Sequence, residues 1–257
     1  MTQSEKRIFL IKKLLKENKT YASMRIPEGD DEQKALLRAL MNVRLPSSID
    51  SDFLRLQDEY LSEENKKRGI VTLMQMEEVQ PDIYIWKGDI TRLAVGAIVN
   101  AANSGMTGCY QPCHNCIDNC IHTYAGIQLR SFCSDMMLRQ GFEEPTGQAK
   151  LTPAFNLPCD YVIHTVGPIV SGRLTKKHEE LLSSCYKSCL KLADDNGIAS
   201  IAFCCISTGV FMFPNERAAC IAVETVKEYK KKTSSRIKVV FNVFKDEDER
   251  IYRQLLR

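Results

Sequence analysis

Residues 95–105 read VGAIVNAANSG, and they are the most informative segment for the fold of the chain. It begins with a short apolar run and passes through two asparagines, with small residues between them, to a glycine. Such an apolar run predicts a buried strand, and the Asn and Gly residues predict a tight turn with exposed backbone. Further short apolar runs predict strands at residues 83–86, 161–164, 201–206 and 238–243.

Helical patterns lie between these strands, at residues 116–140, 176–196, 214–231 and 246–256. Strands that alternate with helices predict an α/β layered fold around a buried, largely parallel sheet. In such sheets ligands bind beyond the carboxyl ends of the strands. The loops after residues 99 and 206 are therefore the first places to look for a site.

The first 80 residues have a different pattern and read as helices. Apolar residues recur at helical spacing at Ile8, Ile11 and Leu15, and similar repeats follow residues 27–30 and 46–48, which are turn-rich breaks. We expect residues 1–80 to form a helical extension packed on a main domain of residues 81–257. A membrane-binding amphipathic helix at the N-terminus is the weaker alternative.

The composition is that of an ordinary globular protein, with 44% hydrophobic and 26% charged residues. A net charge of +3 is too small to indicate nucleic-acid binding, and the run Lys230–Lys232 reads as a solvated helix end. The 11 cysteines are scattered, and neither a secretory segment nor a membrane span of ~18 apolar residues is visible. We therefore expect a cytoplasmic protein, and a monomer because no coiled-coil pattern appears.

Three loops carry polar residues suited to binding a nucleotide. Asp89, in the segment GDIT of residues 88–91, can accept a hydrogen bond from an amine, although an Asp there also suits a helix N-cap. Asn100 and Asn103 can orient a hydroxyl group or a water molecule, or can simply build a turn. The segment STGVF of residues 207–211 precedes a helix, where backbone N–H groups and the helix dipole favour a phosphate.

A cluster of four Cys and two His residues lies between residues 109 and 122. Zinc selects thiolate and imidazole ligands, and the expected set is Cys109, His114 and Cys116, which leaves a fourth position open as in a catalytic site. Cys113 could replace one ligand, and Cys120 lies one helical turn beyond Cys116. The alternatives are a structural zinc knuckle and a redox pair of Cys113 with Cys116. His164 lies within an apolar strand and is expected to be a core residue.

Five segments recur in an order that resembles the macrodomain family over residues 83–256. They are residues 88–91 (GDIT), 97–104 (AIVNAANS), 149–152 (AKLT), 161–168 (YVIHTVGP) and 207–211 (STGVF). The resemblance implies a three-layer α/β/α sandwich with a mixed, largely parallel central sheet, preceded here by the helical extension. MacroD-type hydrolases usually carry a Gly-rich catalytic loop after the second segment, and here the Cys/His cluster replaces it.

That replacement is similar to the zinc-dependent microbial branch of macrodomains, in which a Cys-x4-His-x-Cys pattern holds zinc beside the distal ribose. Cys109, His114 and Cys116 match the pattern, while Cys113 is additional to it. The resemblance implies that Asn103 orients the distal ribose near zinc. Asp118 is a candidate general base, although an Asp at a helix start also suits capping.

The resemblance also implies how ADP-ribose lies in the site. Asp89 would hold the adenine amine, Ile90 would supply a backbone N–H, and Phe244 or its neighbours Asn242 and Asp246 would line the adenine end. Two loops would cradle the pyrophosphate, one on each side: Ser104, Gly105, Met106, Thr107 and Gly108 on one, and Ser207, Thr208, Gly209, Val210 and Phe211 on the other.

The implied activity is a zinc-dependent hydrolysis that removes mono-ADP-ribose from protein side chains, with acidic residues as the expected linkage. In the similar microbial systems a sirtuin-like transferase and a lipoyl-carrier protein accompany this branch, so a modified lipoyl carrier is the expected partner. The competing hypothesis is a non-catalytic module that binds ADP-ribose and carries a structural zinc. The third hypothesis is an unrelated α/β domain that carries a structural zinc knuckle.

Overall fold

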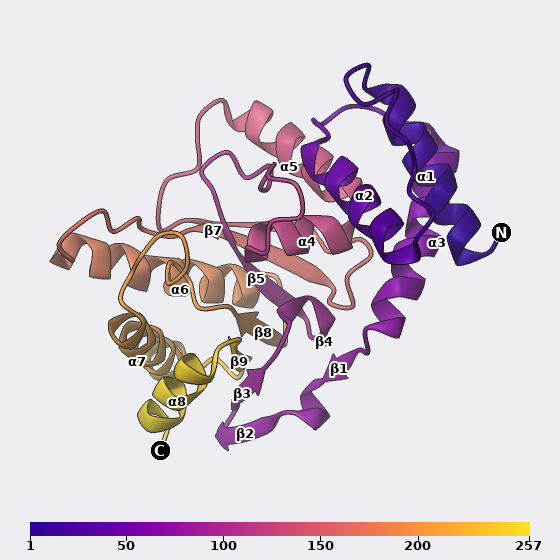
Figure 1. Ribbon diagram of the computed structural model, residues 1–257. Helices are drawn as coiled ribbons and strands as arrows, with labels where there is room; N and C mark the ends of the chain where they lie inside the picture. Colours follow the sequence, from indigo (N-terminus) through magenta and orange to yellow (C-terminus); the bar gives the residue numbers. More distant parts are fainter.

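The five predicted strands lie in one seven-stranded sheet, with β2 and β6 added at its edges, in a computed structural model that describes residues 1–257 (Figure 1). The strand order is β2-β3-β9-β8-β5-β7-β6, with bounds β2 Glu77–Gln80, β3 Ile83–Lys87, β9 Lys238–Val243, β8 Ser200–Phe203, β5 Ala97–Ala102, β7 Tyr161–Val166 and β6 Ala149–Pro153. The five inner strands are parallel, and the two edge strands are antiparallel to their neighbours. The prediction of a mixed, largely parallel sheet is confirmed.

Helices cover both faces of this sheet. One face carries α6 Lys176–Asp195, α7 Asn215–Thr233 and α8 Asp246–Leu255, which pack on one another in sequence order. The other carries α4 Ile117–Ala125 and α5 Ile127–Gln140 (Figure 1). The inner strands are buried along their length because helices lie on both sides, which explains their continuous apolar runs. None of the helices combines the length and the apolar character needed to cross a bilayer.

The single helix predicted over residues 116–140 is two helices, and Gly126 separates them. Gly126 has a φ of +98°, which L side chains rarely adopt. A Cβ atom there would lie 2.7 Å from the side-chain nitrogen of Gln57. The periodic apolar pattern runs through the break, and for that reason the sequence predicted one element.

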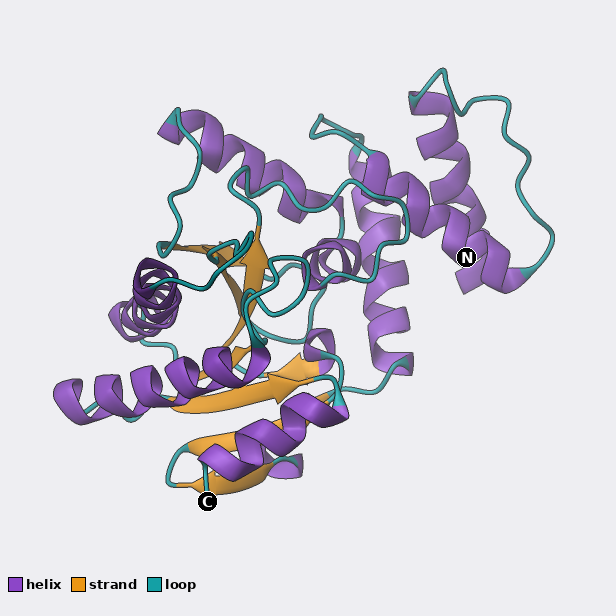
Figure 2. Ribbon diagram, turned by 60° about the vertical axis from the view of Figure 1, so that its left-hand side comes forward, coloured by secondary structure: helices purple, strands orange, loops and turns teal.

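Three helices form the N-terminal extension: α1 Gln3–Glu17, α2 Asp30–Val43 and α3 Ser51–Lys67. They enclose a second apolar core of twelve buried residues, to which Ile127 of α5 contributes. Figure 2 shows this three-helix unit beside the sheet domain, and α2 and α3 pack against α4. The extension is therefore joined to the helical layer that follows β5.

The last ten residues of the predicted extension are not helical. Strand β1 (Val71–Thr72) pairs with β4 (Leu93–Ala94), a 3-10 turn spans Leu73–Gln75, and β2 joins the main sheet at its edge. The expectation of helix there was wrong because β2 is a partly exposed edge strand with two adjacent glutamates. Such a strand lacks the apolar run that identifies a buried one.

Candidate active site

The predicted site loops meet at one edge of the sheet. Strands β3, β9, β8 and β5 are parallel neighbours, so their carboxyl ends lie side by side. The loops that leave them contain Asp89, Phe244, residues 207–211 and residues 103–116, respectively. The fold thus places four segments that are far apart in sequence along a single edge, as ligand binding by open α/β sheets requires.

Cys109, His114 and Cys116 come together in the loop between β5 and α4. Their ligand atoms all lie within 4.8 Å of one another, and Cys109 Sγ is 3.6 Å from His114 Nδ1. Cys116 is also the N-cap of α4, where its sulfur accepts a hydrogen bond from Asn119 N. Two sulfurs and one imidazole nitrogen at this spacing fit the donor preference of zinc, with one coordination position left over.

The other two cysteines of the cluster are directed elsewhere. Cys113 Sγ donates a hydrogen bond to Ala35 O of α2 at 3.4 Å. Cys120 Sγ accepts one from the Arg38 guanidinium at 3.7 Å. Neither belongs to the group of three close donors. Within this cluster, Cys109, His114 and Cys116 are thus the residues whose spacing suits a metal ion.

Asn103 and Asp118 are hydrogen-bonded to each other beside this group. Asn103 Nδ2 donates to Asp118 Oδ2 and to Gly108 O, both at 3.1 Å, and Asn100 Nδ2 donates to Asp118 Oδ1 at 2.8 Å. Asp118 is only 6% exposed, and it is Cys116 that caps α4. Burial raises the pKa of Asp118 to about 6, while the Asn100 amide, the Arg130 charge and the Asn103 amide act in the opposite direction.

Beneath this pair, His164 of β7 is a fully buried core residue, as predicted. Its Nδ1 lies 3.1 Å from Asn100 Nδ2 and its Nε2 lies 3.0 Å from Thr152 Oγ1. Burial lowers the pKa of His164 to about 3, so the ring is neutral. His122 and Cys133 lie close by, but both nitrogens of His164 already have partners, and this second group is part of the core.

The loop of residues 207–211 turns sharply at Ser207, which has a φ of +66°. The Ser207 hydroxyl is buried without a hydrogen-bond partner in the chain. Gly167, from the segment YVIHTVGP, lies against it, and a Cβ atom on Gly167 would be 2.1 Å from Ser207 Oγ. At the tip of the loop Val210 is 73% exposed. Thr208 Oγ1 donates to Cys205 O at 2.9 Å, which fixes the base of the turn.

The facing segment, residues 104–108, is placed along the same edge. Ser104, Gly105 and Thr107 are half-buried, whereas Met106 and Gly108 are buried. Met106 packs into the main core with a φ of +60°. It anchors the start of the loop, while its neighbours Ser104, Gly105 and Thr107 keep part of their surface exposed.

Asp89 lies at the expected adenine end and also caps the 3-10 turn Ile90–Arg92, where it accepts a hydrogen bond from Thr91 N. Its carboxylate pairs with Arg68, at the end of α3. The Arg68 guanidinium in turn stacks on the Tyr124 ring, 3.5 Å from its centroid. Ile90 is buried.

Three residues lie at the carboxyl end of β9, on this same edge of the sheet: Asn242 within the strand, and Phe244 and Asp246 after it. Phe244 is 71% exposed at this edge. The Asn242 side chain donates to the carbonyls of Trp86 and Gly88 and so braces the turn before Asp89. Asp246 pairs with Lys87. Of the three, Phe244 is the one with a free side chain to lie against a base.

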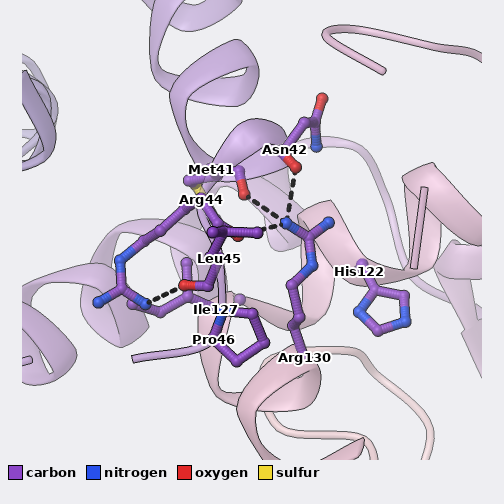
Figure 3. Close-up of a pocket in the computed structure, with 9 residues that line it drawn as sticks. Met41, Asn42, Arg44, Leu45, Pro46, His122, Ile127 and Arg130 are labelled. Atoms are coloured by element: carbon purple, nitrogen blue, oxygen red, sulfur yellow. Dashed lines mark hydrogen bonds between the residues drawn. The ribbon is translucent and has the colours of Figure 1, made fainter. Parts of the chain in front are cut away.

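Behind the Cys109–Cys116 loop, Arg130 of α5 connects this loop to the end of α2. Figure 3 shows the Arg130 guanidinium directed at the carbonyls of Met41 and Asn42, with His122 on its other side. The cavity that these residues line has a volume of about 10 Å³, room for about one water molecule. It is far too small for a nucleotide.

Four polar residues that contact the site could not be recognised from the sequence: Arg38, Asn42, Arg68 and Arg130. Each lies in a helix or at its end, among charged and apolar residues that read as an ordinary amphipathic surface. Their partners are backbone groups and side chains more than 20 residues away. Local sequence patterns therefore could not identify them.

Comparison with known proteins identifies the family. A family model described as Macro domain matches residues 99–222. The chain is 60% identical over 260 residues to a protein-ADP-ribose hydrolase of Treponema medium, covering all of both chains. It is 45% identical over 248 residues to one of Staphylococcus aureus (strain MSSA476), covering 96% of this chain and 93% of the relative.

A solved structure extends the comparison to the fold. The Trypanosoma brucei macrodomain in complex with ADP-ribose matches with a TM-score of 0.66 and 28% identity, over 86% of this chain and 95% of that chain. The match with a family model, the two long alignments and the shared fold agree. The chain belongs to the macro domain family.

Proposed function

We propose that this protein is a zinc-dependent hydrolase that releases mono-ADP-ribose from acidic side chains of modified proteins in the cytoplasm. One observation carries the proposal: Cys109, His114 and Cys116 converge beside Asn103, at the carboxyl edge of a macrodomain sheet. The relatives with the printed name protein-ADP-ribose hydrolase support a glycosidase-type reaction. The macrodomain structure in complex with ADP-ribose supports the ligand.

ADP-ribose would lie along the edge, with its adenine at β3 and β9 and its distal ribose at β5. Asp89 accepts a hydrogen bond from the adenine amine, Ile90 offers its backbone N–H, and Phe244 lies against the base. Residues 207–211 and 104–108 hold the pyrophosphate between them. The Ser207 hydroxyl, buried and without a partner in the chain, is available to a phosphate oxygen.

The Asn103 side chain is suited to accept a hydrogen bond from the distal ribose rather than to donate one to it. Both hydrogens of its amide nitrogen go to Gly108 O and Asp118 Oδ2. Its oxygen accepts one bond, from Gly105 N at 3.0 Å, and an amide oxygen has capacity for a second. A ribose hydroxyl or a water molecule therefore donates to Asn103 Oδ1, and Asp118 acts as a positioning residue through Asn103.

Cys109, His114 and Cys116 would hold the zinc ion and leave one position open toward the ribose. Zinc bound there would supply a Lewis acid, able to polarise an oxygen or to lower the pKa of water. The surrounding residues fix the geometry: Asn103 orients the sugar, and the two loops keep the pyrophosphate in place. The bond that breaks joins the distal ribose to the protein side chain.

The decisive experiment follows release of ADP-ribose by mass from a protein mono-ADP-ribosylated on glutamate, with and without a zinc chelator. We expect release that the chelator abolishes and added zinc restores. Cys109→Ala and His114→Ala should remove turnover while leaving most of the ADP-ribose affinity, and Cys220→Ala on α7 serves as the matched control. Turnover that persists after complete removal of zinc would refute the catalytic role of the metal.

Two further outcomes address the alternatives. Tight ADP-ribose binding with no release from any linkage would establish a reader module. Release from a serine-linked but not a glutamate-linked substrate would correct the linkage and leave the hydrolase activity as proposed.

A lipoyl-carrier protein modified by a sirtuin-like transferase is the first protein substrate that we propose to test. It would be compared with an unrelated glutamate-modified protein.

A further inference from the structure

We infer that helix α2 of the N-terminal extension, through Arg38 and Asn42 and with Arg130 of α5, holds the Cys109–Cys116 loop in the shape that brings its three donors together. This inference rests on the proposed function, because it concerns how the proposed metal ligands are positioned. It assigns the N-terminal extension a role in positioning the proposed metal ligands. None of these three residues is expected to touch substrate or metal, so each is a positioning residue.

The loop is tied to its surroundings by backbone groups at or beside the ligand residues. Arg38 Nη2 donates to His114 O at 2.7 Å. Cys113 N donates to Asn42 Oδ1 at 2.9 Å. Arg130 Nη2 donates to Cys109 O at 3.3 Å. Cys109 and His114 are thus held through their own carbonyls, and Cys113, beside His114, is held through its N–H.

The anchoring side chains are themselves rigidly held. Asn42 is buried, and its Nδ2 donates to Thr123 Oγ1 of α4 at 2.9 Å. Arg130 is buried, and its Nη1 donates to the carbonyls of Met41, Asn42 and Arg44 at 3.2, 2.6 and 2.7 Å, respectively (Figure 3). These carbonyls end α2 and have no partner within the helix. Arg130 therefore joins the end of α2 to the loop.

A ring in the loop adds to this connection. The Tyr110 side chain covers the Arg130 guanidinium at 4.2 Å from the ring centroid, a distance that suits a cation–π contact. Arg38 reaches a second acceptor, Asn119 Oδ1, at 3.1 Å. Asn119 Nδ2 donates in turn to the carbonyls of Cys109 and Gln111. The loop, α2, α4 and α5 thus share one hydrogen-bonded network.

The loop needs such support because little else determines its shape. Residues 103–116 form neither helix nor strand, and Met106 is their one member in the main core. Cys113 has a φ of +54°, a conformation that L residues disfavour. The Cys113 N–H donates to Asn42 Oδ1, so α2 stabilises one of the two non-glycine residues of this segment that have a positive φ.

Packing of the extension does not explain these polar contacts. The twelve-residue core formed by α1 to α3 and Ile127 consists of hydrophobic side chains, whereas Arg38 and Asn42 make hydrogen bonds. Both residues lie on the side of α2 that meets the loop and α4, where their bonds reach residues 71 to 82 positions away. A buried hydrogen-bond network of this kind favours a single geometry of the groups that it joins, whereas apolar packing contributes mainly to stability. The extension is joined to the fold by its core and to the site by these two residues.

The test measures zinc affinity in the full-length chain by competition with a chromophoric chelator, together with the absorption spectrum of the Co²⁺-substituted protein. Arg38→Met and Asn42→Ala should each weaken zinc binding by about 10- to 100-fold and change the Co²⁺ spectrum. The kcat for ADP-ribose release should fall, while the KM should change little. Arg38→Lys, which keeps one donor for His114 O, should restore part of the zinc affinity.

Arg7→Met is the matched control, because Arg7 is a buried arginine of the same extension that bonds Gln33 and has no contact with the loop. It should lower the Tm without changing zinc affinity or the Co²⁺ spectrum. If Arg38→Met and Asn42→Ala bind zinc as the parent does, the inference is wrong and the proposed function stands. A parent protein that binds no zinc would instead overturn the proposed function. Should Arg38→Met not fold, Asn42→Ala and Arg38→Lys decide the question.

Discussion

Asn103 illustrates how one side chain in this site is fixed from several directions. Its nitrogen donates to Gly108 O and Asp118 Oδ2, and its oxygen accepts from Gly105 N. A side chain held by three hydrogen bonds has little rotamer freedom left to lose when a ligand binds. The precision of the proposed ribose contact is therefore set by residues that do not themselves touch the ribose.

At the same scale, Gly167 sets the space available to Ser207. Gly167→Ala would place a Cβ atom 2.1 Å from Ser207 Oγ and displace a residue already at φ +66°. We expect a loss of ~1–3 kcal/mol in the free energy of unfolding and a tenfold or greater loss of ADP-ribose affinity, about 1.4 kcal/mol per tenfold. Thermal unfolding and calorimetric titration measure the two.

The control for this variant is Gly29→Ala, where φ is −74° and only the flexible end of Glu32 must move. It should leave ADP-ribose affinity unchanged. Equal affinity of Gly167→Ala and the parent would show that Ser207 does not contribute to the pyrophosphate site.

His164 should make stability depend on pH. Burial lowers its pKa in the folded state from 6.5 to about 3, so below pH 6.5 the unfolded chain takes up a proton that the folded chain does not. The free energy of unfolding should therefore fall, as pH decreases from about 6.5 toward 3, by about 1.4 kcal/mol per unit for this one group. Denaturant unfolding from pH 7 to 4.5, with chelator present throughout, measures the slope, and His164→Gln should reduce it. If His164→Gln left the slope unchanged, His164 would not be the group responsible for this pH dependence of stability.

At the scale of whole elements, the arrangement of α4 and α5 depends on the break at Gly126. Gly126→Ala would add both an unfavourable φ and a contact of 2.6 Å with the Gln128 side chain. Gly141→Ala, at the end of α5, adds an unfavourable φ of +78° with nothing within 4 Å. We expect ~1 kcal/mol of destabilisation for Gly141→Ala and ~1–3 kcal/mol more for Gly126→Ala. Tm values of the two variants give the difference, and equal Tm values would rule out a packing role.

The elements also show what the sequence could predict. Inner strands such as β5 and β9 are buried on both faces, so their apolar runs identified them. The edge strands β2 and β6 are partly exposed, and no apolar run marks either one. At the site, Cys109, His114 and Cys116 could be proposed as one set because they are close in sequence, and the structure brings their ligand atoms together. Arg38 and Arg130 were not found, because only the packing of α2 against the loop brings them to it.

At the scale of the whole molecule, two separate apolar cores support the site. One comprises 51 buried residues around the sheet and the other comprises twelve, eleven in the extension and Ile127 of α5, and neither contains Cys109, His114 or Cys116. Most of the stability of the fold therefore resides outside the Cys109–Cys116 loop. This arrangement differs from a zinc knuckle, in which binding of the metal supplies the folding energy.

Removal of zinc should accordingly abolish turnover without unfolding the protein. At a free zinc concentration of 1,000 times the Kd, zinc binding adds about 4 kcal/mol to the free energy of unfolding. Removal of zinc should therefore lower the Tm, while far-UV circular dichroism at 25 °C stays unchanged. Readdition of zinc should restore the Tm and the activity together. Loss of the helical signal on chelation would instead indicate that the metal holds the fold.

The extension touches the edge of the sheet at two places: Arg68 pairs with Asp89, and Arg38 donates to His114 O. Both arginines belong to one three-helix unit with a single core. A small molecule wedged between that unit and the 103–125 segment would disturb the adenine end and the ribose end together. Such a molecule would lower the affinity for ADP-ribose without occupying the nucleotide site, and it would be recognised by arginine-rich contacts instead of as a nucleotide mimic.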